Sequence, residues 1–151
     1  MKVVFLDFDG VLKSEKYVLS CREGGVVLDP SKMVLLKQIV YLTDAKIVLS
    51  TSWREHWENN PTKCNSTGRQ INDIFAKYGL HIFDKTPKLH LGREQEIKSW
   101  LDRHAEVDNF VVLDDMFLSA DFLEGHFVKT SNYLGGLDGT AAENAVRILN
   151  R

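Results

Sequence analysis

Cysteine and long apolar runs are both scarce in this chain of 151 residues. The two cysteines, Cys21 and Cys64, lie in polar stretches, form no CxxC pair and have no histidine at zinc-binding spacing. We therefore expect two reduced thiols, as in cytoplasmic proteins, and no disulfide between them. No apolar run approaches the roughly 20 residues of a membrane-spanning helix. The first apolar run ends at Asp7, which is too early for the core of a signal peptide, so we expect neither membrane insertion nor export.

A marked excess of charge of either sign is also absent. The 19 basic and 21 acidic residues give a net charge of -2, which excludes a broadly basic nucleic-acid-binding surface but leaves room for a local basic groove. Hydrophobic residues make up 44% and charged residues 26% of the chain, a balance typical of globular proteins. A chain of this length can form one core of real size, so we treat residues 1–151 as a single domain.

Apolar runs alternate along the chain with segments of helical periodicity. The expected strands cover residues 2–7, 45–51, 81–86, 110–114 and 126–130. The expected helices cover residues 31–43, 69–78, 94–104 and a C-terminal segment from about residue 140, where Thr140 and Glu143 form a capping box. Strands that alternate with helices predict an α/β fold, with a parallel sheet covered by helices on both faces. A short hairpin is expected around Gly24 and Gly25.

Polar side chains stand at the ends of three of these strands. Asp7 follows the first strand, Thr51 ends the second, and Asp114 and Asp115 follow the fourth. Parallel sheets bind ligands at the carboxyl ends of their strands, so these side chains should meet at one edge. Carboxylates that converge there repel one another, and a hard divalent cation such as Mg²⁺ relieves that repulsion, often together with a substrate phosphate. The sequence therefore predicts a Mg²⁺ site that handles phosphate.

Four segments carry a resemblance to a known family. Residues 5–12 (FLDFDGVL) resemble the first motif of the haloacid dehalogenase (HAD) phosphohydrolases, and residues 48–52 (VLSTS) resemble the second. Residues 92–97 (GREQEI) resemble the third motif and residues 111–115 (VVLDD) the fourth, in the order of the family. The stretches around Thr51 and after Arg93 also look like the small HAD-type domains of RNA-repair proteins. The resemblance implies a three-layer, Rossmann-like HAD fold.

The resemblance also implies a role for each matching residue. Asp7 would be the nucleophile that forms an aspartyl-phosphate. Asp9 would be the general acid and then the base, and crowding by other carboxylates would favour its protonated form. The implied ligands of Mg²⁺ are Asp7, Asp9 through its backbone carbonyl, Asp114 and, in support, Asp115. The implied phosphate-binding residues are Thr51, Ser52, Arg93 and Gly10. Two alternatives stay open, because Lys88 could replace Arg93 and Ser50 could replace Thr51.

An aromatic and basic cluster follows the second motif, formed by Trp53, Arg54, His56 and Trp57. Aromatic rings and a cation beside a phosphate site could stack a nucleobase. Ordinary packing at the start of a helix is the alternative, and we favour it.

The spacing of the motifs leaves no room for a sizeable cap domain over the site. Only residues 8–30 separate the first expected strand from the first expected helix, and the stretch between Arg54 and Lys88 is filled by an expected helix and strand. We therefore expect a Mg²⁺-dependent phosphomonoesterase with an open site, suited to bulky phosphorylated substrates such as nucleic-acid ends. We expect no obligatory protein partner. The alternatives are a small-nucleotide phosphatase and a phospho-acceptor or non-catalytic module of the same fold.

Overall fold

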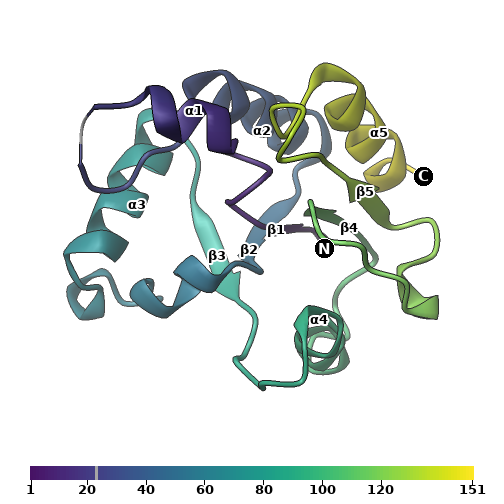
Figure 1. The fold of residues 1–151 in the computed structure, drawn as a ribbon. Coiled ribbons are helices and arrows are strands. Elements are labelled where there is room, and N and C mark those ends of the chain that lie inside the picture. Colours follow the sequence, from purple (N-terminus) through teal and green to yellow (C-terminus); the bar gives the residue numbers. More distant parts are fainter. Residues whose placement is uncertain (23) are drawn as a thin grey trace.

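The computed structural model describes residues 1–22 and 24–151, which form a five-stranded parallel sheet flanked by helices (Figure 1). The strand order is β3-β2-β1-β4-β5, with β1 in the centre. The strands are β1 (Lys2–Leu6), β2 (Lys46–Leu49), β3 (Ile82–Lys85), β4 (Asn109–Asp114) and β5 (Phe127–Lys129). The helices are α1 (Glu15–Ser20), α2 (Pro30–Thr43), α3 (Ser66–Lys77), α4 (Arg93–Asp102) and α5 (Gly139–Leu149), with short 3₁₀ turns η1 (Ser52–His56), η2 (Pro61–Lys63) and η3 (Asp121–Leu123).

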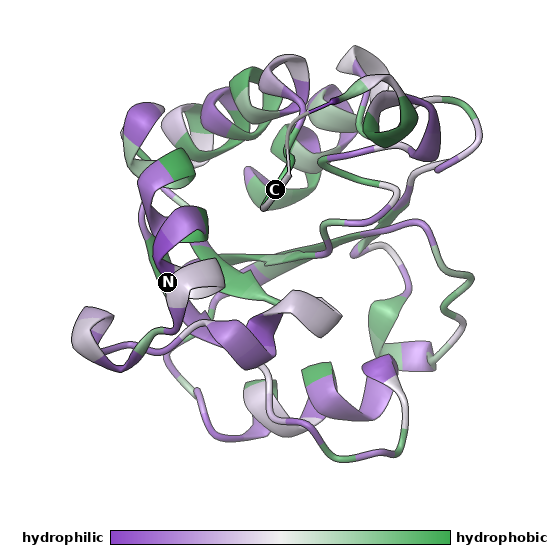
Figure 2. Cartoon of the chain, turned by 60° about the vertical axis from the view of Figure 1, so that its left-hand side comes forward, coloured by the Kyte–Doolittle hydropathy of each residue, from purple (hydrophilic) through white to green (hydrophobic). Residues whose placement is uncertain are grey.

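The two faces of the sheet are buried under separate hydrophobic clusters. Val4 and Leu6 of β1 belong to the cluster under α2, α3 and α5, whereas Val3 and Phe5 belong to the cluster under α4. This alternation follows from the period of two along a strand, and it gives a three-layer α/β fold. Figure 2 shows the apolar strands between helices whose outer surfaces carry hydrophilic residues.

The order in which strands are added to the sheet reverses at β1. The chain moves outward on one side from β1 to β2 and β3, and then returns to add β4 and β5 on the other side. The crevice at such a switch point lies between the carboxyl ends of the two central strands, β1 and β4 in this sheet. The predicted α/β fold with a parallel sheet is therefore confirmed, and the crevice marks where a ligand should bind.

Local signals explain most helix boundaries. Asp29 caps α2, where its side chain accepts a hydrogen bond from the Ser31 N–H (2.9 Å) and Pro30 occupies the first turn. The predicted capping box at Thr140 is wrong, because α5 begins at Gly139 and Asp138 is its N-cap. The Asp138 side chain accepts from the Ala141 N–H at 2.8 Å, so the stronger capping residue sets the start.

The connection between β1 and α2 contains a short helix instead of the expected hairpin. Ser14 caps α1 by accepting a hydrogen bond from the Tyr17 N–H (3.1 Å), and no strand pair is found around Gly24 in the ranges 7–22 and 24–29. Between β2 and β3 the structure places only η1, η2 and α3. The described residues therefore contain no separate cap domain over the sheet edge. None of the helices in these residues has both the length and the apolar character needed to cross a membrane.

Candidate active site

Asp7, Ser50 and Asp114 form a row across the three central strands. Leu6 pairs with both Leu49 and Leu113, and each residue of the row follows one of these leucines. The ladder continues into the row, because the Asp7 N–H donates to the Leu113 carbonyl (3.1 Å) and the Ser50 N–H donates to the Leu6 carbonyl (2.9 Å). Two carboxylates and a hydroxyl group therefore lie at the carboxyl ends of β1, β4 and β2, and the hydroxyl group in this row belongs to Ser50, the alternative to Thr51, because β2 ends at Leu49.

Three carboxylates converge on this edge of the sheet. Asp7, Asp114 and Asp115 each offer an oxygen, and these oxygens all lie within 4.8 Å of one another. Asp7 and Asp114 are buried. Asp115 approaches so closely to Gly10 that a Cβ atom at Gly10 would lie 2.3 Å from an Asp115 Oδ2, and Gly10 has a φ of +81°. The lack of a side chain at Gly10 thus makes room for the Asp115 side chain. This steric role differs from the phosphate contact that was expected of Gly10.

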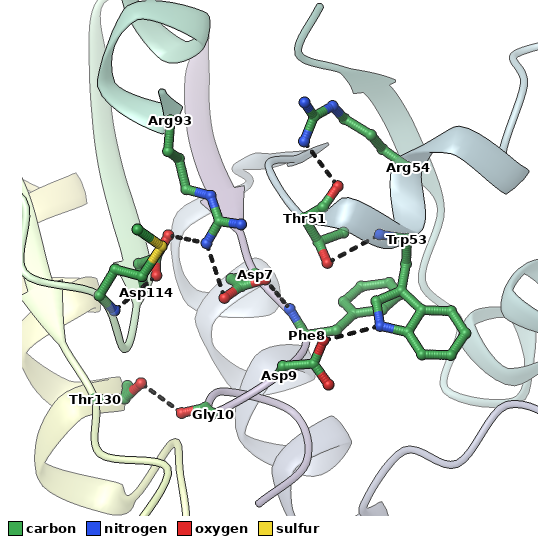
Figure 3. Close-up of polar contacts among 11 residues, drawn as sticks. Asp7, Phe8, Asp9, Gly10, Thr51, Trp53, Arg54, Arg93, Asp114 and Thr130 are labelled. Carbon is green, nitrogen blue, oxygen red and sulfur yellow. Dashed lines mark hydrogen bonds and ion pairs between the residues drawn. The ribbon is translucent and has the colours of Figure 1, made fainter. Parts of the chain in front are cut away.

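The guanidinium group of Arg93 reaches two of these carboxylates from the first residue of α4 (Figure 3). Its Nη1 donates to Asp7 Oδ2 at 3.0 Å and to Asp114 Oδ2 at 2.7 Å. Lys88, the alternative basic residue, pairs instead with Glu55 and is half exposed. The geometry therefore places Arg93, and not Lys88, at the carboxylate cluster.

Burial makes two carboxylates of the cluster, those of Asp7 and Asp114, costly to ionise. Burial raises the pKa of Asp7 to about 7, even though the Arg93 cation, the Phe8 N–H and the Thr51 hydroxyl group act to lower it. Burial also raises the pKa of Asp114, against the opposing effect of Arg93. For Arg93, burial lowers the pKa, but Asp7 and Asp114 outweigh this effect and raise it. Arg93 is thus the cation that contacts both buried acids.

Thr51 and Ser50 are both buried after the end of β2. Thr51 is fully buried and caps η1, where its Oγ1 accepts from the Trp53 N–H at 3.3 Å. The Thr51 hydroxyl also lowers the pKa of Asp7, which places it at that carboxylate. The Ser50 Oγ is buried without a hydrogen-bond partner among residues 1–22 and 24–151. Ser52 is exposed at the start of η1, farther along the same turn.

Asp9 is placed differently from the expectation. Its carboxylate is 58% exposed and does not belong to the acidic cluster. It accepts a hydrogen bond from Trp53 Nε1 at 3.0 Å and lies 3.4 Å from Lys13 Nζ. The expected crowding of Asp9 by other carboxylates is therefore wrong, because its side chain turns toward η1 and away from β4 (Figure 3).

Residues of the aromatic and basic cluster that follows the second motif make different contacts. Trp57 is buried and donates from Nε1 to Asn72 (2.9 Å), so it packs as expected. Arg54 is buried, donates to the Thr51 carbonyl (2.9 Å) and forms an ion pair with Glu96 of α4. This pair ties the turn after β2 to the helix that carries Arg93.

Sequence reasoning missed Lys13 and the polar role of Trp53. Lys13 is buried, and its Nζ lies 4.0 Å from the centre of the Trp53 ring. The sequence did contain a signal for Lys13. This lysine lies four residues after Asp9 and directly follows two apolar residues, so it could have been expected to be buried. The contact of Trp53 with Asp9 spans 44 residues and has no local signal in the sequence.

The donor set fits a hard divalent cation. Magnesium prefers oxygen ligands, usually one or two carboxylates completed by water and phosphate oxygens. The close oxygens of Asp7, Asp114 and Asp115 provide such ligands. These three side chains could therefore hold Mg²⁺.

Comparison with known proteins identifies the family. No match was found among curated proteins, and none was found among solved structures. The family described as the HAD domain in Swiss Army Knife RNA repair proteins matches residues 3–138, which include all four motifs and every residue of the carboxylate cluster. The parallel sheet and the positions of the strand-end acids agree with this match. The chain therefore belongs to the family of HAD domains found in Swiss Army Knife RNA repair proteins.

Proposed function

We propose that this protein is a Mg²⁺-dependent phosphomonoester hydrolase that acts through an aspartyl-phosphate on Asp7. The single observation that carries the proposal is the contact of Arg93 Nη1 with both Asp7 (3.0 Å) and Asp114 (2.7 Å) beside a third carboxylate. A nucleophilic carboxylate, a fixed cation and a set of oxygen ligands are the parts that phosphoryl transfer requires.

The Asp7 carboxylate is suited to attack because one of its oxygens is fixed. Oδ1 accepts from the Phe8 N–H at 2.8 Å, whereas Oδ2 faces Arg93. Attack of one oxygen on phosphorus forms the new P–O bond while the bond to the leaving oxygen breaks. Arg93 and the Thr51 hydroxyl would then stabilise the charge on the phosphoryl oxygens. Ser52 and the backbone near Gly10 are further candidates to contact that group.

Asp9 would act first as the general acid and then as the general base. It would give a proton to the leaving oxygen in the first step, and take a proton from the water that hydrolyses the aspartyl-phosphate in the second. Asp7, Asp114, Asp115 and the backbone carbonyl of Asp9 would hold Mg²⁺, which would neutralise charge and orient the phosphate.

The proposed substrates are bulky phosphorylated ends, such as nucleic-acid termini. The absence of a cap domain among residues 1–22 and 24–151 supports this proposal, because an open edge admits a large substrate. The family's occurrence in RNA-repair proteins points the same way. A small-nucleotide phosphatase is the second candidate, favoured by the same charge arrangement but not by the missing cap.

A substrate panel separates these candidates. Release of phosphate is measured with Mg²⁺ from 3′-phosphate oligonucleotides, 5′-phosphate oligonucleotides, mononucleotides and phosphopeptides at equal concentration. We expect kcat/KM to be highest for one class of oligonucleotide. Higher values for mononucleotides would support the second candidate, and equal values for all four would remove the argument for large ends.

A further inference from the structure

Trp53, Lys13 and Asp9 form a connected cluster beside the acidic site (Figure 3 shows Trp53 and Asp9). Trp53 Nε1 donates to Asp9 Oδ2 at 3.0 Å, and Lys13 Nζ lies 3.4 Å from Asp9 Oδ1. Lys13 Nζ also lies over the Trp53 ring, 4.0 Å from its centre. Each member therefore contacts both of the others, and both oxygens of the Asp9 carboxylate have a partner.

The burial of Lys13 indicates that the cluster is more than surface packing. The Lys13 side chain is only 8% exposed, and a buried ammonium group is costly unless it is compensated. Its compensation comes from the Asp9 carboxylate and from the face of the indole ring. The backbone adds a further restraint, because the Gly10 N–H donates to the Lys13 carbonyl at 2.8 Å and closes the turn that carries Asp9.

The other two tryptophans donate their indole N–H groups to residues outside the first motif. Trp57 Nε1 donates to Asn72, and Trp100 Nε1 donates to Asp84, so both of these indoles bond to groups away from the carboxylate cluster. Trp53 alone among the three directs its N–H at a residue of the first motif. Because Thr51 and Trp53 share the turn after β2, the same turn that brings a hydroxyl group to Asp7 also brings an indole N–H to Asp9.

We propose that Trp53 and Lys13 are positioning residues that hold the Asp9 carboxylate in the orientation needed for proton transfer. The inference rests on the proposed function, since Asp9 is given the general acid and base role there. In the first step protonated Asp9 gives its proton to the leaving oxygen as the P–O bond to that oxygen breaks, and becomes the carboxylate that Trp53 and Lys13 contact. In the second step Asp9 takes a proton from the water that attacks phosphorus, and Asp7 is released. Neither Trp53 nor Lys13 exchanges a proton with the substrate.

The dependence of rate on the leaving group measures this role. A leaving oxygen of low basicity, such as that of p-nitrophenyl phosphate, departs with little help from an acid, whereas a basic alkyl oxygen needs the proton. A fault in the position of Asp9 should therefore slow alkyl phosphates and spare p-nitrophenyl phosphate. A general structural fault, or a fault in phosphate binding, should slow both substrates alike.

Trp53→Phe and Trp57→Phe form a matched pair of variants. Both keep an aromatic ring and lose one indole N–H, but only Trp53 bonds to Asp9. We expect Trp53→Phe to lower kcat for an alkyl phosphate by about tenfold and kcat for p-nitrophenyl phosphate by less than about twofold. Lys13→Gln should show the same pattern, and Trp57→Phe should change neither substrate. Equal slowing of both substrates, or no slowing, would overturn the proposal. A rise in KM for oligonucleotides with unchanged kcat would also overturn it, in favour of base stacking by Trp53.

A second measurement does not depend on turnover. The three tryptophans should give three indole N–H signals in an ¹⁵N–¹H correlation spectrum, and Trp53→Phe identifies the signal of Trp53. We expect Asp9→Ala to shift that signal and to leave the signals of Trp57 and Trp100 in place. An unmoved Trp53 signal would contradict the hydrogen bond on which the proposal rests, even if the wild-type protein hydrolysed no tested phosphate. Absence of hydrolysis with the expected shift would instead count against the proposed function.

Discussion

The guanidinium group of Arg93 lies 3.0 Å from the Asp7 carboxylate, although 86 residues separate the two in the chain. The contact arises because Arg93 is the first residue of α4, which packs against the face of the sheet that carries Val3 and Phe5 of β1. A fixed cation at this position can contact a carboxylate before reaction and phosphoryl oxygens during it.

Replacement of Arg93 should separate the two basic candidates for the third motif. We expect Arg93→Met to lower kcat/KM for an aryl phosphate by about 10²-fold, the usual cost of one lost donor to the transferring group. Lys88→Met should change kcat/KM by less than about twofold, because Lys88 pairs with Glu55 on the surface. Steady-state kinetics of both variants give the comparison. A large loss in Lys88→Met with little loss in Arg93→Met would reverse the assignment.

The stability of the metal-free protein should depend on pH through Asp7. Its pKa is about 7 in the folded chain, above the 3.8 of an unperturbed aspartate, so the folded state holds the proton more tightly. The contribution of Asp7 is therefore fully present below about pH 4 and is lost as pH rises toward 7, at no more than about 1.4 kcal/mol per pH unit. Asp7→Asn cannot ionise and should escape this loss.

Urea unfolding of both proteins in EDTA, from pH 4 to pH 8, tests this dependence. As pH rises to about 7, the wild-type protein should lose stability relative to Asp7→Asn, and above about pH 7 the difference in unfolding free energy should stay constant. Addition of Mg²⁺ at pH 8 should stabilise the wild-type protein more than the variant. A difference that is constant across the pH range would show that burial does not perturb Asp7.

Gly10 should be intolerant of a side chain. A Cβ atom at this position would lie 2.3 Å from an Asp115 oxygen, and the φ of +81° adds strain for alanine. We expect Gly10→Ala to lower the unfolding free energy by about 1–2 kcal/mol and to raise the Mg²⁺ concentration needed for activity, because Asp115 must move. Gly139→Ala is the control, since nothing lies within 4 Å of its added Cβ and alanine favours a helix. Equal tolerance at both glycines would contradict the close approach of Asp115.

The buried pair of Arg54 and Glu96 should stabilise the link between η1 and α4. Glu96 Oε2 also accepts from the Leu89 N–H at 3.1 Å, so its loss leaves two donors without a partner. We expect Glu96→Ala, which removes the acceptor of both donors, to lower the unfolding free energy by about 3 kcal/mol. Asp102→Asn removes an exposed partner of Lys98 from the same helix and should cost less than about 1 kcal/mol. Denaturant unfolding measures both, and similar costs would argue against the buried pair.

The sequence was sufficient for the fold and for the strand-end acids. Short continuous apolar runs identify β1 and β4, and parallel topology then places Asp7 and Asp114 at one edge. The direction in which the Asp9 side chain points could not be predicted from the sequence. Asp9 turns toward Trp53 and Lys13 because of a contact between the loops after β1 and β2, and no local pattern encodes that contact.

Short elements were also difficult to predict. The helix α1 depends on Ser14 as its cap, and the paired glycines that follow favoured a hairpin on local grounds. At α5, two candidate caps lie two residues apart, and the side chain of Asp138, rather than that of Thr140, reaches the free N–H groups. The sequence favoured Arg93 for the third motif but left Lys88 open, and the contacts of Arg93 with Asp7 and Asp114 distinguish them.

The most direct test of the account is hydrolysis of p-nitrophenyl phosphate by the wild-type protein and by Asp7→Asn, each with Mg²⁺ and with EDTA. The proposed mechanism predicts turnover by the wild-type protein with Mg²⁺, a loss of at least about 10³-fold in Asp7→Asn, and comparable loss in EDTA. Circular dichroism checks that the variant is folded. Full turnover by a folded Asp7→Asn protein would contradict the assignment of Asp7 as the nucleophile.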